Sequence, residues 1–186
     1  MQHERTLAFI GAGNMSRSII AGLIQAGYPA GRIIAANPSR PKLDELADQF
    51  GIRITQNNAE AAREADVIVL AVKPQLMAAM LEALVAELGS LAGKLLISIA
   101  AGIKVERLQE MAGGHSRIIR TMPNTPSLLG LGMTGLYAPS GIEQADRDFA
   151  EQMMQAVGKT LWVAQESGIN GVIAAAGSAP AYFFLF

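Results

Sequence analysis

Two glycines near the amino end of the chain have the spacing of a phosphate-binding turn. Gly11 and Gly13 follow a short apolar run, and a helical pattern begins directly after them at Asn14. The first glycine permits the tight turn, and the second lets a phosphate approach the backbone closely. The helix start supplies free N–H groups and a positive dipole end. A dinucleotide diphosphate fits this arrangement; a glycine turn without a ligand is the alternative. Ser16 stands where a third glycine is usual, so we expect a slightly wider helix–strand contact there.

The end of the next expected strand indicates which dinucleotide is bound. Enzymes that prefer NAD usually carry Asp or Glu at this position, where the carboxylate binds the ribose 2′-hydroxyl. Here Asn37 is followed by Pro38, Ser39 and Arg40, without a carboxylate to repel a 2′-phosphate. Ser39 and Arg40 could donate hydrogen bonds and charge to that phosphate. We therefore expect NADP(H) in preference to NAD(H), with Asn37, Ser39 and Arg40 at the cofactor. The alternative is that Arg40 is only a solvated residue at a helix start.

Three further segments leave expected strands at the edge where ligands of open α/β sheets bind. Lys73 and Pro74 end one strand where the ribose of a dinucleotide should pass. The small residues at 98–102 would let a flat ring approach the backbone. Two prolines lie close to Asn124 and stiffen its loop, which could hold the amide towards a nicotinamide or a substrate. Each segment also has a structural interpretation, as a solvated strand end, packing or turn chemistry. Their shared edge favours binding.

Short apolar runs alternate with longer amphipathic segments along the chain, as in βα units on a parallel sheet. The runs lack polar alternation, which suits strands covered by helices on both faces. We therefore predict an α/β protein with a Rossmann, doubly wound and mostly parallel sheet. The expected strands are 6–10, 32–36, 51–55, 67–72, 95–100, 117–121, 132–137 and 160–163, and the expected helices are 14–26, 42–50, 75–88 and 143–157.

The composition excludes several other classes of protein. Hydrophobic residues make up 51% and charged residues 17%, which allows a packed core and argues against disorder. The net charge is −1 without a run of Lys or Arg, so we expect no nucleic-acid partner. Because there is no cysteine, and His3 and His115 stand far apart, we expect no metal site. No segment reaches the roughly 20 apolar residues of a membrane span, and we expect a soluble cytoplasmic protein.

The carboxyl-terminal segment has the pattern of a second domain at its start. Ser178 would cap a new helix, and Pro180 would lie in its first turn. Only a few, mostly apolar residues follow before Phe186, too few for a helix that is stable alone. We therefore predict a dinucleotide-binding Rossmann domain at 1–164 and the start of a truncated helical dimerisation domain at 165–186.

Five segments resemble the pyrroline-5-carboxylate reductase family, in the same order along the chain. They are Gly-Ala-Gly-Asn-Met at 11–15, Val-Lys-Pro-Gln at 72–75, Ser-Ile-Ala-Ala-Gly at 98–102, Met-Pro-Asn-Thr-Pro at 122–126 and Gly-Ser-Ala-Pro-Ala-Tyr at 177–182. The last of them departs from the family pattern, because Ala176 and Ala179 replace a serine and a glycine. The family's later Gly-Gly-Thr-Thr segment, which helps to hold the substrate carboxylate, would lie beyond Phe186.

The resemblance implies NAD(P)H-dependent reduction of 1-pyrroline-5-carboxylate to L-proline, the last step of proline biosynthesis. It also implies a homo-oligomer that assembles through the helical domain. The implied cofactor contacts are Gly11, Gly13, Asn14 and Met15 for the diphosphate, Asn58, Ala71, Val72, Lys73 and Pro74 for the adenosine and ribose, and Ala100 for the nicotinamide.

The residues alone leave the chemistry less defined. No side chain is clearly placed as a general acid, and Asn124 is the one candidate orienting residue. We expect these 186 residues to bind NADP(H) but to have little or no reductase activity, because substrate contacts are expected beyond Phe186. Two alternatives stay open. One is another NADP-dependent reductase of the same superfamily, acting on a deazaflavin or a hydroxy acid, and the other is a non-catalytic dinucleotide-binding module.

Overall fold

One eight-stranded sheet forms the centre of the computed structural model, which describes residues 4–172 and 174–175. The strand order is β3-β2-β1-β4-β5-β6-β7-β8, and the strands from β3 to β6 pair in parallel. β7 runs antiparallel to β6, and β8 runs parallel to β7. The predicted doubly wound Rossmann sheet is therefore confirmed. The strands are β1 Leu7–Ile10, β2 Ile33–Ala36, β3 Arg53–Thr55, β4 Val67–Leu70, β5 Leu95–Ser98, β6 Ile118–Met122, β7 Gly132–Tyr137 and β8 Gly158–Trp162.

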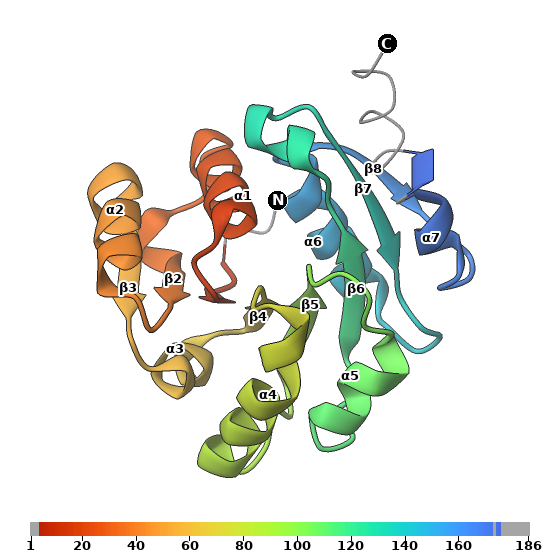
Figure 1. The fold of residues 1–186 in the computed structure, drawn as a ribbon, viewed down its shortest axis with the longest axis horizontal. Coiled ribbons are helices and arrows are strands. Elements are labelled where there is room, and N and C mark those ends of the chain that lie inside the picture. Colours follow the sequence, from red (N-terminus) through yellow and green to blue (C-terminus); the bar gives the residue numbers. More distant parts are fainter. Residues whose placement is uncertain (1–3, 173, 176–186) are drawn as a thin grey trace.

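Helices cover both faces of this sheet (Figure 1). α1, α2 and α6 lie on one face, where Ile19, Leu43 and Phe149 belong to one buried apolar cluster. α3, α4 and α5 lie on the other, where Met77 and Leu108 belong to a second cluster. β1, β2, β4 and β5 are buried along their whole length, which explains why their residues are apolar apart from Ser98 at the end of β5. The helices are α1 Asn14–Gln25, α2 Arg40–Phe50, α3 Asn58–Glu64, α4 Pro74–Leu88, α5 Val105–Met111, α6 Gln144–Gln155 and α7 Gly168–Val172, with 3-10 turns η1 Ala30–Arg32 and η2 Thr125–Leu129.

The sequence-based bounds differ from the structure where apolar patterning continues past the hydrogen-bonded ladder. The expected strands 67–72 and 95–100 end at Leu70 and Ser98, and the strand expected at 160–163 begins earlier, at Gly158. α3 and α5 were not predicted, because seven residues are too few for a clear helical period. The expected helix start at Ser178 and Pro180 lies outside the described residues.

The last described helix, α7, packs against β7. A side chain at Gly135 of β7 would place its Cβ 3.0 Å from a methyl group of Val172, so the glycine allows this close approach. Ile169 and Val172 are both buried. The described part of the segment predicted to begin a second domain thus lies on the sheet, and the boundary after residue 164 stays a prediction.

No helix within residues 4–172 and 174–175 is long and apolar enough to cross a membrane. Across the same residues, no group of His, Asp and Glu side chains could hold a metal ion.

Candidate functional site

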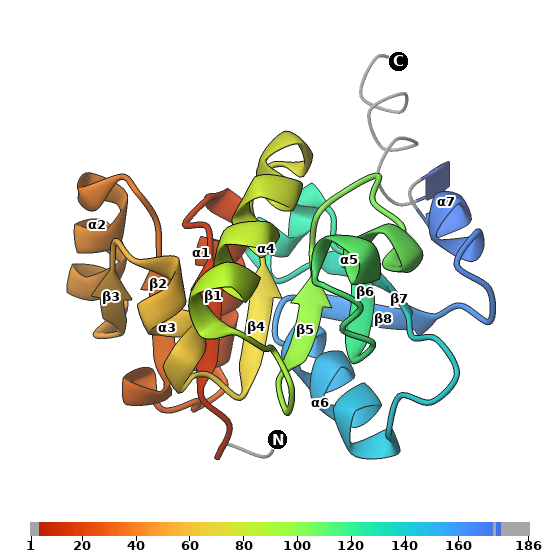
Figure 2. The ribbon, with the colours of Figure 1, turned by 90° about the horizontal axis from the view of Figure 1, so that it is seen from below.

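The predicted site segments all follow the carboxyl ends of parallel strands. Because β1 to β6 run in the same direction, these ends meet at one edge of the sheet. Figure 2 shows the arrowheads of β4 and β5 pointing to that edge. β1 lies between β2 and β4, which is the point where the strand order reverses and where such folds bind ligands. The turn that carries Gly11 and Gly13 follows β1 directly.

Gly11 is held in a conformation that only glycine adopts readily. Its φ is +112°, and a Cβ on it would lie 2.5 Å from the carbonyl oxygen of Ala71 in the segment after β4. Its N–H donates to the carbonyl oxygen of Ala36 at the end of β2, at 2.8 Å. The tight turn predicted from the sequence is therefore also a close contact between three strand ends.

Gly13 leaves the start of α1 open. Among residues 4–172 and 174–175, no atom lies within 4 Å of the position that a Cβ on Gly13 would occupy. Gly13 is the N-cap residue in an extended conformation, and no side chain caps the helix start. The first N–H groups of α1, on Asn14 and Met15, therefore have no capping side chain and are suited to an anion. A hollow of about 370 Å³ lies against this turn and is lined by Ala12, Gly13, Asn14, Arg17, Lys42, Glu45 and Leu46.

Asn37 joins the glycine turn to the segment after β2. Its side-chain oxygen accepts from the N–H of Ala12 at 3.2 Å, and its Nδ2 donates to the carbonyl oxygen of Ser39 at 3.4 Å. Asn37 stands where enzymes that prefer NAD have a carboxylate. Its amide holds the two backbone segments together.

Arg40 lies at the start of α2 and is largely exposed. Its Nε donates to the carboxylate of Asp44 at 2.7 Å, an i,i+4 pair within the helix. This geometry agrees with the solvated-residue alternative as well as with a role at the 2′-phosphate. Lys42, one residue beyond the proline of the same helix, lines the hollow at the glycine turn. Sequence reasoning missed Lys42, although its place in the first turn of α2 was a usable signal.

A second hollow, of about 390 Å³, lies beside the ends of β2 and β3. It is lined by Pro38, Gln56, Asn57, Asn58, Ala59, Met80, Ala83, Leu84 and Glu87. Asn58, predicted at the adenosine, is therefore part of a concave surface. The neighbouring Asn57 instead caps α3, accepting from the N–H groups of Ala59 and Glu60 at 2.9 and 3.2 Å.

The segment after β4 borders the glycine turn. Ala71 and Val72 are half-buried, whereas Lys73 and Pro74 are exposed at the start of α4. Because Ala71 is in contact with Gly11, a ligand at the turn must also pass this segment. Ala100, after β5, is buried, and its N–H donates to the hydroxyl of Ser98 at 3.3 Å.

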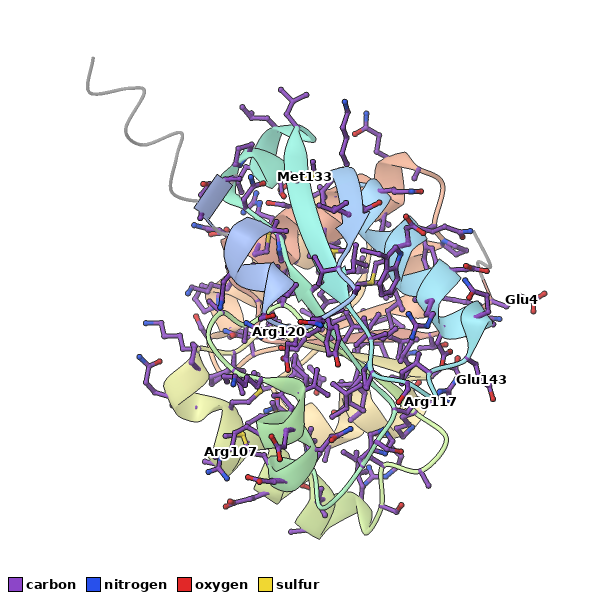
Figure 3. All side chains as sticks on the ribbon, turned by 90° about the vertical axis from the view of Figure 1, so that its right-hand side faces the viewer. Glu4, Arg107, Arg117, Arg120, Met133 and Glu143 are labelled. Atoms are coloured by element: carbon purple, nitrogen blue, oxygen red, sulfur yellow. The ribbon has the colours of Figure 1, made fainter. Side chains whose placement is uncertain are left out.

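The side chain of Asn124 forms a hydrogen bond within the protein. Its side-chain oxygen accepts from the N–H of Met133 in β7, at 2.9 Å (β7 and Met133 are labelled in Figures 1 and 3). The structure therefore directs this oxygen at β7 rather than at a ligand, because the antiparallel return from β6 to β7 brings the backbone of Met133 beside the loop. The orienting role of Asn124 stays a prediction, and its side-chain oxygen, which binds Met133, is not the atom that would orient a ligand.

A cluster of ionisable side chains lies at the amino ends of the parallel strands, opposite the proposed binding edge. Asp146 of α6 is fully buried; its two oxygens lie 2.5 Å from Nε and 2.8 Å from Nη2 of Arg117, and Nη1 of Arg5 lies 2.8 Å away. Burial by itself raises the pKa of Asp146, but the hydrogen bonds and charges of Arg117 and Arg5 outweigh it and hold the pKa below its ordinary value. His115, before β6, has its pKa lowered by burial. Sequence reasoning missed this cluster.

An ion pair between the buried Arg120 and the half-buried Glu166 joins β6 to the segment before α7. Nη1 of Arg120 lies 2.9 Å from Oε1 of Glu166, and the same oxygen accepts from the N–H of Val105 at 2.8 Å. In Figure 3 Arg120 lies between α7 and α5. Glu166 therefore also places a negative charge at the amino end of α5, where the helix dipole favours it.

Known proteins are similar to this chain along its whole length. Residues 6–102 match the family described as NADP oxidoreductase, coenzyme F420-dependent. A pyrroline-5-carboxylate reductase of Vibrio alginolyticus is 56% identical over 186 residues, which are 100% of this chain and 67% of the relative. The chain belongs to the pyrroline-5-carboxylate reductase family. The predicted resemblance is confirmed.

Solved structures of reductases from this family have the same fold. A pyrroline-5-carboxylate reductase of Coxiella burnetii superposes with a TM-score of 0.93 at 41% identity, over 97% of this chain and 67% of that one. The Plasmodium falciparum pyrroline carboxylate reductase, solved with NADP bound, gives a TM-score of 0.84 at 28% identity, over 100% of this chain and 67% of that one. The chain thus spans about two thirds of the length of these reductases.

Proposed function

We propose that this protein reduces 1-pyrroline-5-carboxylate to L-proline with NADPH. Hydride adds to the imine carbon, a proton adds to the nitrogen, and NADPH becomes NADP⁺. The observation that carries the proposal is the 56% identity, over the whole chain, to a protein named for this activity. The open start of α1 behind Gly11 and Gly13 supports it, because a dinucleotide reductase needs a diphosphate site at this position.

The proposed cofactor contacts follow the carboxyl edge of the sheet. When bound, NADPH supplies the hydride, and the protein orients the reacting groups. The turn residues Gly11, Gly13, Asn14 and Met15 bind the diphosphate through backbone N–H groups. Asn37, Ser39 and Arg40 border the 2′-phosphate. Lys42, which lines the hollow at the glycine turn, adds a second positive charge near it. Asn58 and residues 71–74 border the adenosine and ribose, and Ala100 the nicotinamide.

The described residues contribute orientation and exclude water. Small residues after β5 and the buried Ala100 let a ring approach the backbone. Holding the imine carbon at near-attack distance accounts for a large part of the rate in such a reaction. The groups with displaced pKa values, among them His115 and Asp146, lie at the opposite edge of the sheet, and we assign none of them the proton transfer.

We also propose that the protein is a cytoplasmic homo-oligomer without a nucleic-acid partner. An exposed apolar surface on η2 and its exit supports an oligomer, since Leu128, Leu129 and Leu131 are 52%, 79% and 75% exposed. The net charge of −1 supports the absence of a nucleic-acid partner. Light scattering at several protein concentrations tests whether this leucine surface assembles the 186-residue chain, and a monomer at every concentration would contradict that role of the surface.

A second candidate is reduction of a deazaflavin by NADPH, which the name of the family matched by residues 6–102 favours. Because little or no turnover is expected of these 186 residues alone, one assay separates the two on a chain extended by the part of the relatives that this chain does not span. NADPH oxidation is followed at 340 nm, a standard wavelength, with 1-pyrroline-5-carboxylate or with coenzyme F420 as the acceptor. Oxidation only with the imine supports the proposal, and oxidation only with coenzyme F420 contradicts it.

A further inference from the structure

We infer that Ser16 is a positioning residue, whose hydroxyl holds the glycine turn in the shape that presents N–H groups to the cofactor diphosphate. The inference rests on the proposed function, since it concerns NADP(H) binding. Ser16 lies in the first turn of α1 and is 1% exposed. Its Oγ donates to the carbonyl oxygen of Gly11 at 2.7 Å. The residue that replaces the usual third glycine therefore forms a bond that glycine cannot form.

Gly11 is fixed from three directions, and Ser16 supplies one of them. The N–H of Gly11 is bonded to Ala36 of β2, and the carbonyl of Ala71 fills the space where a Cβ would stand. The hydroxyl of Ser16 binds the remaining polar group of Gly11 from the helix side. The φ of Gly11 is +112°, so the chain turns out of β1 here, and its carbonyl is held by the hydroxyl of Ser16 while its N–H is held by β2.

The geometry separates a positioning role from contact with the ligand. The residues that line the hollow at the turn include Ala12, Gly13 and Asn14 but not Ser16, which is buried. The hydroxyl proton of Ser16 is directed at Gly11 and is not available to a phosphate. Ser16 therefore acts through the backbone, by fixing the turn from which the first N–H groups of α1 project.

Ser18 is a matched control in the same helix. Its Oγ donates to the carbonyl oxygen of Asn14 at 2.8 Å, and the residue is 7% exposed. This is the ordinary bond of a helical serine to the residue four positions earlier. Ser16 and Ser18 thus differ in the carbonyl that the hydroxyl binds, which is that of Gly11 before the helix for Ser16 and that of Asn14 within the helix for Ser18.

The test compares Ser16→Ala with Ser18→Ala and the unmodified chain. Dissociation constants are measured by calorimetry for NADPH and for adenosine 2′-monophosphate, which has no diphosphate. For each variant the ratio of the two constants is used, because loss of folded protein affects both ligands alike. We expect Ser16→Ala to weaken NADPH binding roughly three- to tenfold, as for one lost hydrogen bond, with adenosine 2′-monophosphate unchanged. We expect Ser18→Ala to change neither constant.

Two results would overturn the inference while leaving the proposed function standing. One is that Ser16→Ala binds NADPH as tightly as the unmodified chain. The other is that it loses affinity for both ligands by the same factor, which would indicate a purely structural role. If the unmodified chain binds no NADPH, the proposed function fails and the inference fails with it.

Discussion

The two edges of the parallel sheet are built from different kinds of group. At the carboxyl edge, the glycine turn is shaped by contacts of Gly11 with Ala36 and Ala71, and by the neutral side chains of Ser16 and Asn37. At the amino edge lie Tyr28, Lys94, His115, Arg117 and Asp146, whose pKa values burial and ion pairing displace. The two edges therefore have different roles. Fixed backbone dipoles form the binding edge, and charged pairs hold the elements together at the other.

Removing the Asp146 carboxylate should have the largest effect. Asp146→Ala leaves Arg5 and Arg117 without their counter-charge. Because these two arginine side chains are 18% and 34% exposed, we expect a loss of about 2–3 kcal/mol of unfolding free energy, less than for a fully buried pair. Urea unfolding measures the loss. The control is Asp148→Ala, which removes an exposed carboxylate from the same helix. If the amino edge only stabilises the fold, the folded variant keeps its affinity for NADPH. A weakened affinity would show that the two edges do not have separate roles.

The same pair gives a pH dependence with a fixed sign. The pKa of Asp146 is lower in the folded chain than its ordinary value of 3.8, so the unfolded chain binds more protons on acidification. The stabilisation is complete above that ordinary value and is lost as the pH falls through the depressed pKa. Asp146→Asn should therefore give a flatter dependence of unfolding free energy on pH below about 4. If the unfolding free energy of Asp146→Asn fell with pH as steeply as that of the unmodified chain, Asp146 would not be the source of this pH dependence.

Substitution of the two glycines should separate folding from binding at the carboxyl edge. Gly11→Ala forces a side chain into the carbonyl of Ala71 at positive φ, so we expect a loss of about 1–3 kcal/mol in stability together with loss of NADPH binding. Gly13→Ala meets no atom of the protein, so stability should stay the same while the new methyl group obstructs the diphosphate. Thermal unfolding and NADPH titration of both variants test this. An unchanged NADPH affinity of Gly13→Ala would show that the diphosphate does not occupy the space at Gly13.

Cofactor choice gives a smaller effect. Arg40→Ala and Lys42→Ala each remove one cation near the proposed 2′-phosphate, and dissociation constants for NADPH and NADH measure the preference. We expect each to raise the constant for NADPH by a few fold, on the order expected for an exposed charge pair, and to leave NADH unaffected. An effect of Lys42→Ala alone would identify Arg40 as a partner of Asp44 only.

His115 should give the smallest change. Burial lowers the pKa of its imidazole, so the unfolded chain binds the proton more readily and stability falls as the pH falls below the ordinary value of 6.5. We expect His115→Gln to remove less than about 1 kcal/mol of this dependence, with NADPH affinity unaltered. Unfolding free energies measured between pH 5 and 7.5, a range chosen to span that titration, decide the matter. If the unfolding free energy had the same pH dependence in His115→Gln and in the unmodified chain, His115 would not be the source of that dependence.

The sequence predicts those parts of the molecule that depend on local patterns. The glycine turn, the apolar strands and the long helices follow from spacing and periodicity, and all six parallel strands could be recognised in this way. The cluster around Asp146 could not, because Arg5, Arg117 and Asp146 meet only after the sheet has formed. For the same reason, the sequence did not indicate the partners of Asn124 or Glu166. Ser16 is intermediate, since its position was noticed but its bond to Gly11 depends on the exact shape of the turn.

The most direct test is a crystal structure of the protein soaked with NADPH. The account predicts diphosphate oxygens within hydrogen-bonding distance of the backbone N–H groups of Asn14 and Met15, with the turn at Gly11 unchanged. A fully occupied NADPH elsewhere on the molecule, or no bound cofactor at saturating concentration, would contradict it.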